Sequence, residues 1–327
     1  MRDTAAGTSP IRVGFQVWGQ HATWSELMAT ARAIERLGFD SLWANDHLFP
    51  AAGPDAGRPD APIGPTFEAW AMLAGFAAVT TRIPLGVLVS AAAYRNIGVV
   101  VKHATGLDHL SSGRVTLGLG AGWHERDHRA FGLGLLPLGD RITRFEEQAL
   151  TARRLLDGEE VTFEGRFVRM ERAVNLPPPV GRMPLLIGGS GERRTLRIVA
   201  RYADVWNGEG DPATVARRNT ILDEHCRAIG RDPIAVRRTV GIPPIAIRAS
   251  RDMALDALTD RLVRSGLAPA DARETARMSA LADTAPAVMD RLDAWRRAGA
   301  EEVIVDWPGT PDGETLERLA EARQQRG

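Results

Sequence analysis

The chain has 327 residues, of which 44% are hydrophobic and 25% are charged, as in an ordinary globular protein with a sizeable core. Lys and Arg together number 41, as do Asp and Glu, and this balance argues against nucleic acid as the main partner. The single cysteine, Cys226, excludes an internal disulfide framework and a cysteine-based zinc cluster. Residues 1–9 contain no apolar stretch and no long apolar run follows, so we expect a cytoplasmic protein without a membrane span.

The chain alternates between segments with strand character and segments with helical periodicity. Helical spacing of apolar residues is clear at 24–37, where Thr23 and Glu26 have the spacing of a capping box and Gly38 stands just beyond the end. Apolar strand-like runs lie at 11–17, 41–44, 83–90, 114–119, 185–187, 203–206, 235–247 and 302–306.

Eight units of one strand and one helix predict a TIM barrel, with an open doubly wound sheet as the alternative. The open sheet is disfavoured because Gly19-Gln20-His21 follows the first strand, where a dinucleotide fingerprint would stand. We expect one domain over 1–327, with a barrel core at about 11–310. Residues 50–65 are predicted to be a loop, and about 250–283 a helical insertion that acts as a lid or a dimer element.

Four segments stand at the carboxyl ends of predicted strands, where barrels place their active sites. In Asn45-Asp46-His47, an acid beside an imidazole can orient a substrate and move a proton, or can merely cap a turn. In 88–95, small residues leave room for a flat ligand beside the backbone, although a close-packed loop has the same composition.

The third segment, 120–125, combines two glycines that permit close backbone approach with a wall, a donor and an acid: Trp123, His124 and Glu125. His124, Glu125 and His128 also match the H-E-x-x-H pattern of zinc proteases. We expect no metal here, because the motif begins where a loop is predicted and a third ligand is not evident.

The fourth segment, Gly188-Gly189-Ser190-Gly191, joins a predicted strand to a helix that begins at Glu192. Free backbone N–H groups at such a turn bind anions, and Arg193 and Arg194 follow at once. A phosphate site is therefore predicted, with a simple tight turn as the alternative. The segment lacks the Gly-Lys-Ser/Thr of a Walker motif, which argues against nucleotide hydrolysis.

Together these segments resemble the luciferase-like superfamily of flavin and deazaflavin enzymes, most closely its F420-dependent oxidoreductase branch. The resemblance covers nearly the whole chain, in order and spacing. It implies a TIM barrel with an insertion after the fourth to fifth strands, and a homodimer. The matching residues are GFDSLWANDHLFP (38–50), TLGLGAGWHERDHRAFG (116–132), PLLIGGSGERRTLRIVARYADVWN (184–207) and AGAEEVIVDWP (298–308).

The resemblance also implies roles for single residues. His47 would transfer the proton, Asp46 would contact the cofactor, and Glu125 would approach the other side of the ring system. Leu88 and Val89 match the place of a non-prolyl cis peptide that forms a bulge behind the ring. The implied cofactor-binding set is Asp46, Leu88, Val89, Ala91, Trp123, His124, Gly188, Gly189, Ser190, Gly191 and Arg193, and Ala91 stands where relatives commonly carry a hydroxyl.

The cofactor supplies the chemistry in such enzymes. Reduced deazaflavin donates hydride, whereas reduced FMN reacts with oxygen. The Asp-His pair favours coenzyme F420 and hydride transfer to or from a small organic substrate. The alternatives are an FMNH2-dependent two-component monooxygenase and a non-catalytic cofactor-binding relative. A flavin or F420 reductase is an expected partner.

Overall fold

The computed structural model describes residues 10–51 and 64–326. The start of the chain at 1–9 and most of the predicted loop at 50–65 lie outside the described residues. Among the helices that are described, each is too short or too polar to traverse a lipid bilayer.

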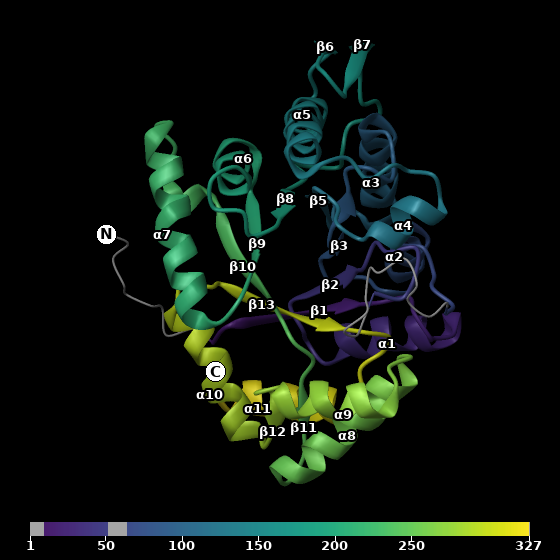
Figure 1. The fold of residues 1–327 in the computed structure, drawn as a ribbon, viewed down its shortest axis with the longest axis vertical. Coiled ribbons are helices and arrows are strands. Elements are labelled where there is room, and N and C mark those ends of the chain that lie inside the picture. The colour runs from purple at the N-terminus through teal and green to yellow at the C-terminus, as the bar shows by residue number, and fades with distance from the viewer. Residues whose placement is uncertain (1–9, 52–63, 327) are drawn as a thin grey trace.

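Eight parallel strands of the described chain close into a barrel, which confirms the predicted TIM fold (Figure 1). Their order is β3-β2-β1-β13-β10-β9-β8-β5, and pairing of β3 with β5 closes the ring, while the short β4 (Ser90–Ala91) pairs with the end of β5. The barrel strands are β1 (Arg12–Val17), β2 (Ser41–Ala44), β3 (Leu85–Val87), β5 (Val115–Gly120), β8 (Leu185–Gly188), β9 (Val205–Glu209), β10 (Arg237–Ile242) and β13 (Glu302–Trp307).

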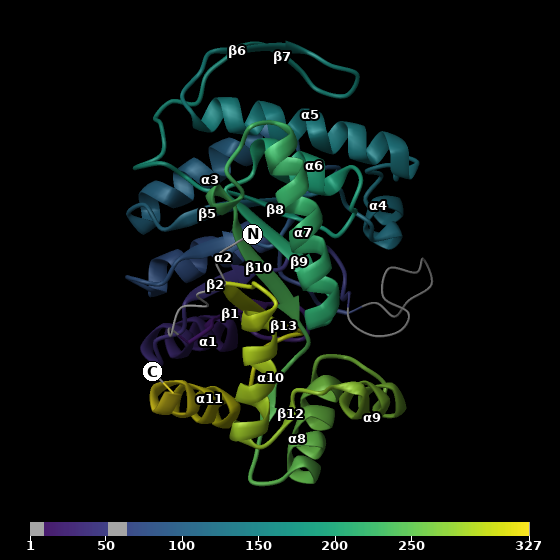
Figure 2. The same cartoon turned by 90° about the vertical axis from the view of Figure 1, so that its left-hand side faces the viewer.

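Helices surround the barrel in the expected alternation (Figures 1 and 2). The predicted capping box opens the first of them, because the Thr23 hydroxyl accepts from the Glu26 amide and the Glu26 carboxylate accepts from the Thr23 amide. The surrounding helices are α1 (Trp24–Arg36), α2 (Ala69–Val79), α3 (Ile97–Ser111), α5 (Leu138–Leu156), α6 (Thr195–Tyr202), α7 (Pro212–Ala228), α10 (Ala285–Arg297) and α11 (Gly313–Arg326).

Two additions interrupt this pattern, and the hairpin of the first lies at the opposite end of the molecule from the second (Figures 1 and 2). The first follows the fourth barrel strand, as implied, and holds the short helix α4 (Glu125–Ala130) and a hairpin of β6 (Val161–Glu164) and β7 (Arg169–Ala173). The second follows the seventh barrel strand and contains the predicted helical insertion. It consists of β11 (Ala246–Ile247), α8 (Arg251–Arg264), α9 (Pro269–Met278) and β12 (Ala282–Asp283).

The structure corrects several predicted boundaries. The predicted loop at 50–65 is followed by helix α2 only from Ala69, because Thr66 pairs with Gln20 in an isolated bridge. The helical insertion is two helices, because Gly266 adopts a left-handed φ of 99° between them. The segment that begins at Glu125 is the helix α4 and not a loop.

Alternation along the strands separates two hydrophobic cores. The larger core lies between the barrel and its helices. The smaller core consists of Trp43, Leu88, Leu186, Val205 and Ile304, which face the barrel interior. Gly86 leaves the space that the Trp43 ring fills, since a Cβ there would collide with it. The barrel is therefore plugged below its mouth, and open space begins at the carboxyl ends of the strands.

Candidate active site

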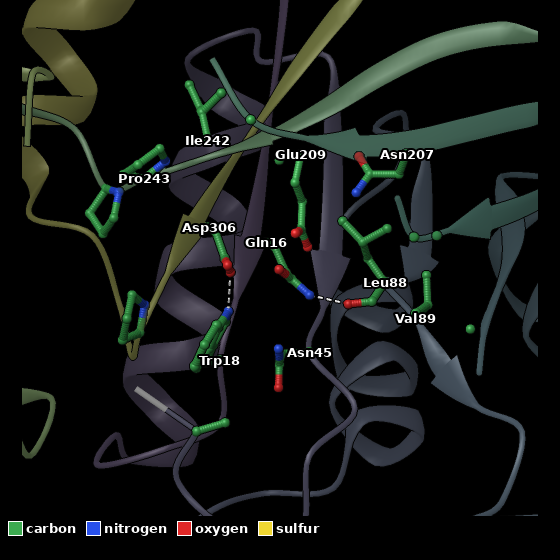
Figure 3. Close-up of a pocket in the computed structure, with 18 of the residues that line it drawn as sticks. Gln16, Trp18, Asn45, Leu88, Val89, Asn207, Glu209, Ile242, Pro243 and Asp306 are labelled. Carbon is green, nitrogen blue, oxygen red and sulfur yellow. Dashed lines mark hydrogen bonds between the residues drawn. The ribbon is translucent and has the colours of Figure 1, made fainter. Parts of the chain in front are cut away.

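A cavity of about 1260 Å³ occupies the mouth of the barrel. Its floor is made by residues at or just beyond the carboxyl ends of all eight barrel strands: Gln16, Asn45, Leu88, Gly120, Gly188, Asn207, Gly241 and Asp306. The second insertion supplies an apolar side wall that includes Leu262, Leu267, Met278 and Leu281. Figure 3 shows polar side chains on the floor and apolar ones beside them. This location matches the place where TIM barrels carry their active sites.

His47 lines the cavity and is held by a buried carboxylate from another segment. Its Nδ1 lies 2.9 Å from Oδ2 of Asp127, and the Tyr94 hydroxyl donates to the same oxygen. Nδ1 of His124 lies 3.1 Å from that oxygen. Burial raises the pKa of Asp127, but hydrogen bonds from His124, His47 and Tyr94 outweigh it and hold that pKa far below its ordinary value. Asp127 is therefore ionised and fixes the His47 ring.

The H-E-x-x-H pattern does not bring its two histidines together around one point. In the described chain, the candidate ligand atoms of His47, His124 and Asp127 lie within 4.8 Å of one another, and His124 is the one histidine of the motif in this group. His128 points elsewhere, with its Nδ1 2.9 Å from the His124 carbonyl. Hydrogen bonds already explain the close approach of the three groups.

Asp46 also lines the cavity, but its carboxylate is bound within the protein. Arg95 donates to both of its oxygens, at 2.7 and 3.0 Å, and also pairs with Glu68. Such a bidentate pair fixes both partners. The predicted contact between Asp46 and a cofactor stays a prediction, and the structure shows Asp46 positioning Arg95.

The peptide bond between Leu88 and Val89 is cis, which confirms the predicted non-prolyl cis peptide. The Gln16 side-chain amide donates to the Leu88 carbonyl across the floor of the cavity (Figure 3). Val89 packs over Gly120 and Gly188, where an added Cβ would lie 2.5 and 2.9 Å from its methyl groups. Absent side chains at these glycines therefore create the space that the bulge occupies.

The predicted phosphate turn lies at the edge of the cavity, but only part of it faces inward. Gly188 and Gly189 line the cavity, and Gly189 has a left-handed φ of 127°. The Ser190 hydroxyl is buried without a hydrogen-bond partner in the described chain. Helix α6 begins at Thr195, three residues later than predicted. Arg193 is exposed and, like Ser190 and Gly191, is not part of the cavity lining.

A family model described as luciferase-like monooxygenase matches residues 7–327. The chain belongs to this family. An uncharacterized protein of Mycobacterium tuberculosis is 30% identical over 233 residues, which cover 68% of this chain and 81% of the relative. An F420-dependent glucose-6-phosphate dehydrogenase of Nakamurella multipartita is 33% identical over 214 residues, which cover 65% of this chain and 60% of the relative. A solved F420-dependent secondary alcohol dehydrogenase, in complex with an F420-acetone adduct, shares the fold with a TM-score of 0.78 at 19% identity, covering 96% of this chain and 98% of that one.

Within this luciferase-like chain, the 120–125 segment divides into residues that face the cavity and residues that do not. Trp123 lines the cavity, and its ring centroid lies 5.4 Å from that of His47 in an edge-to-face arrangement. His124 is fully buried behind the lining, against Asp127. The Glu125 carboxylate is exposed, lies 3.5 Å from Arg129 and does not line the cavity, and its role beside the ring stays a prediction. The acid that reaches His47 is Asp127, two residues further along the same helix.

Sequence reasoning also missed Asp306, at the end of the last barrel strand. Its Oδ1 accepts from the Trp18 indole N–H, and both residues line the cavity (Figure 3). Burial raises the pKa of Asp306 to about 7, against the lowering effect of the Trp18 hydrogen bond and with a further rise from Glu209. The sequence did carry a signal for Asp306, because side chains alternate between the two faces of a strand. Glu302, Ile304 and Asp306 therefore share one face of β13.

Proposed function

We propose that this luciferase-like protein is an F420-dependent oxidoreductase that transfers hydride to or from a small organic substrate. The observation that carries the proposal is the His47–Asp127 pair at a cavity whose floor is the Leu88–Val89 bulge. Family membership and the F420-dependent relatives support an oxidoreductase of the flavin- or deazaflavin-dependent kind.

The chain's own residues fit a flat ring with a phosphate-bearing tail. The cavity volume of about 1260 Å³ exceeds what a small substrate alone needs. The bulge at Leu88–Val89 would support the ring, with Ala91 and Trp123 also in the lining. The orphaned Ser190 hydroxyl beside Gly189 offers a polar group at the turn. Coenzyme F420, when bound, would supply the hydride chemistry.

His47 would move the proton that accompanies hydride transfer. The Asp127 carboxylate accepts a hydrogen bond from Nδ1 of His47, so Nε2 is the ring nitrogen left for the cavity. The same carboxylate stabilises the imidazole ring when it is protonated. Trp18 and Trp123 lie near His47, with ring centroids 6.4 and 5.4 Å away. These rings would limit the access of water to the proton-transfer position.

The test is a titration of the purified protein with F420 and with FMN, each oxidised and reduced, followed by fluorescence or absorbance. Preferential binding of F420 is expected. Preferential binding of FMN, with oxygen consumption, would replace the proposal with the two-component monooxygenase. Binding of neither would leave a barrel of another activity. Light scattering on the same sample tests the predicted homodimer.

A further inference from the structure

Asp306 and Glu209 stand on the part of the cavity that the His47 chemistry does not use. Both residues line the cavity, and they come from the ends of β13 and β9. Glu209 lies close enough to raise the pKa of Asp306. Figure 3 shows both side chains in the pocket, with the Asp306 carboxyl group hydrogen-bonded to Trp18. Two acids therefore line the same cavity and lie close enough to interact electrostatically.

The protein does not neutralise this pair. Among the described residues, Arg291 is the arginine that lines the cavity, and it pairs at 3.0 Å with Asp283. Trp18 gives Asp306 a neutral donor only. The remaining titratable groups of the lining are Asp46, His47, Tyr94 and Asp211, which is the N-cap of α7. Acids in a cavity without a cation favour a ligand that brings positive charge.

Two buried side-chain amides in this region have polar atoms without a hydrogen-bond partner. Asn45 and Asn207 are each 8% exposed and line the same cavity. The Asn45 side chain has no hydrogen-bond partner in the described chain, and Figure 3 shows it standing in the pocket near Trp18. Asn207 accepts from Thr239 at 2.9 Å through Oδ1, which leaves its Nδ2 donor for the cavity. Buried polar groups normally have partners, so a ligand is expected to supply them.

Apolar side chains complete the surroundings of the acids. Ile242 and Pro243 stand beside Asp306 in Figure 3, and Leu267 and Leu281 from the second insertion line the same cavity. An apolar body would be buried here while a polar group reaches the floor.

We propose that Asp306 and Glu209 form a substrate subsite that binds the ammonium group of an apolar amine. This inference rests on the proposed function: the ammonium group would lose a proton to His47, and the α-carbon would lose a hydride to oxidised F420, which leaves a protonated imine. It places carboxylate and phosphate substrates outside the range of the protein, because the two acids would repel them.

The test compares three probes that share one apolar body: benzylamine, benzyl alcohol and benzoate. Calorimetry at pH 8 measures their affinity for the full-length protein, with and without saturating oxidised F420. Benzylamine is expected to bind about tenfold tighter than the alcohol, and benzoate most weakly. Equal affinity for amine and alcohol, tighter binding of benzoate, or no binding of benzylamine would overturn the proposal.

Variants connect the preference to the two acids. Asp306→Asn should lower benzylamine affinity about tenfold and change benzyl alcohol affinity less than about twofold. Glu209→Gln changes a residue near the solvent and should also lower benzylamine affinity. It replaces Asp306→Asn as the test variant if Asp306→Asn does not fold. Asp256→Asn, an exposed acid of α8 outside the lining, is the matched control and should change neither. Unchanged benzylamine binding in both cavity variants would overturn the proposal.

The dependence on pH provides an independent measurement. Because Asp306 has a pKa of about 7, benzylamine affinity should rise between pH 6 and pH 8 as the carboxyl ionises. The rise should be absent in Asp306→Asn. If F420 fails to bind while the amine preference persists, the proposed function is wrong and the subsite stands. If F420 binds without an amine preference, the subsite alone is wrong.

Discussion

Nδ1 of His47 lies 2.9 Å from Oδ2 of Asp127, although 80 positions separate the two residues in the chain. His47 follows β2, and Asp127 belongs to the short helix α4 that follows β5. Strand order makes β3 the neighbour of both β2 and β5, so the loops that follow these strands meet above it. The pair is therefore a product of barrel closure.

The contact between His47 and Asp127 predicts separate effects on turnover and on F420 affinity. His47→Ala should abolish turnover with F420 affinity unchanged, and Asp127→Asn should lower kcat about 100-fold because the imidazole loses its anchoring acceptor. Steady-state kinetics and F420 titration measure the two effects separately. His103→Ala, on the exposed side of α3, is the matched control and should leave both unchanged. A fall in F420 affinity that accounts for the whole loss would contradict a proton-transfer role.

Glu125 provides a test between the acid favoured by the sequence and the acid found in the structure. Glu125→Gln should leave kcat and its pH profile unchanged, because the side chain is exposed beside Arg129. Identical assays on Glu125→Gln and Asp127→Asn decide the matter. A large loss in the Glu125 variant would restore the role implied by family resemblance.

The bulge at Leu88–Val89 depends on missing side chains. Gly188→Ala would place a Cβ 2.9 Å from a Val89 methyl group, so Val89 must shift and F420 affinity should fall about tenfold. Gly106→Ala is the control, since nothing lies within 4 Å of its added Cβ in helix α3. That variant should gain about 0.5–1 kcal/mol of unfolding free energy without a change in F420 binding. Equal F420 affinity in both variants would argue against the bulge as the ring support.

Asp306 predicts how the unfolding free energy depends on pH. Its folded pKa of about 7 lies above its unfolded value, so its contribution to stability is full at low pH and is lost as pH rises toward 7. Asp306→Asn should therefore match the wild type near pH 4 and exceed its unfolding free energy at pH 8, by on the order of 4 kcal/mol. Urea unfolding at pH 4.5, 6 and 8 measures the difference. A gap that stays constant with pH would show that Asp306 titrates normally.

The buried pair of Asp46 and Arg95 predicts a double-mutant result. Arg95→Met should cost about 3 kcal/mol of unfolding free energy, because it leaves the buried Asp46 carboxylate without its cation. Adding Asp46→Asn to Arg95→Met should recover part of that loss. Arg129→Met, at an exposed ion pair, is the control and should change stability by less than about 1 kcal/mol. Additive single effects measured by urea unfolding would contradict the coupling.

The sequence by itself determined the barrel and the location of the site. Strand-like runs alternate with helical periodicity, and these local patterns survive in the fold because each strand and helix buries one continuous apolar face. The capping box at Thr23 and Glu26 is equally local and is confirmed. Strand ends are also readable, so His47, Leu88, Val89 and Gly188 were placed at the cavity correctly.

Only the tertiary structure decided which side chains meet there. Asp127 and Glu125 are alike in the sequence, and the start of helix α4 turns the first toward His47 and the second toward solvent. Asp306 reads as the end of an ordinary apolar strand until barrel closure sets it against Trp18 and Glu209. The physical reason is that hydrogen bonds and charge interactions depend on distances of a few ångströms between segments, which no local pattern of residues specifies.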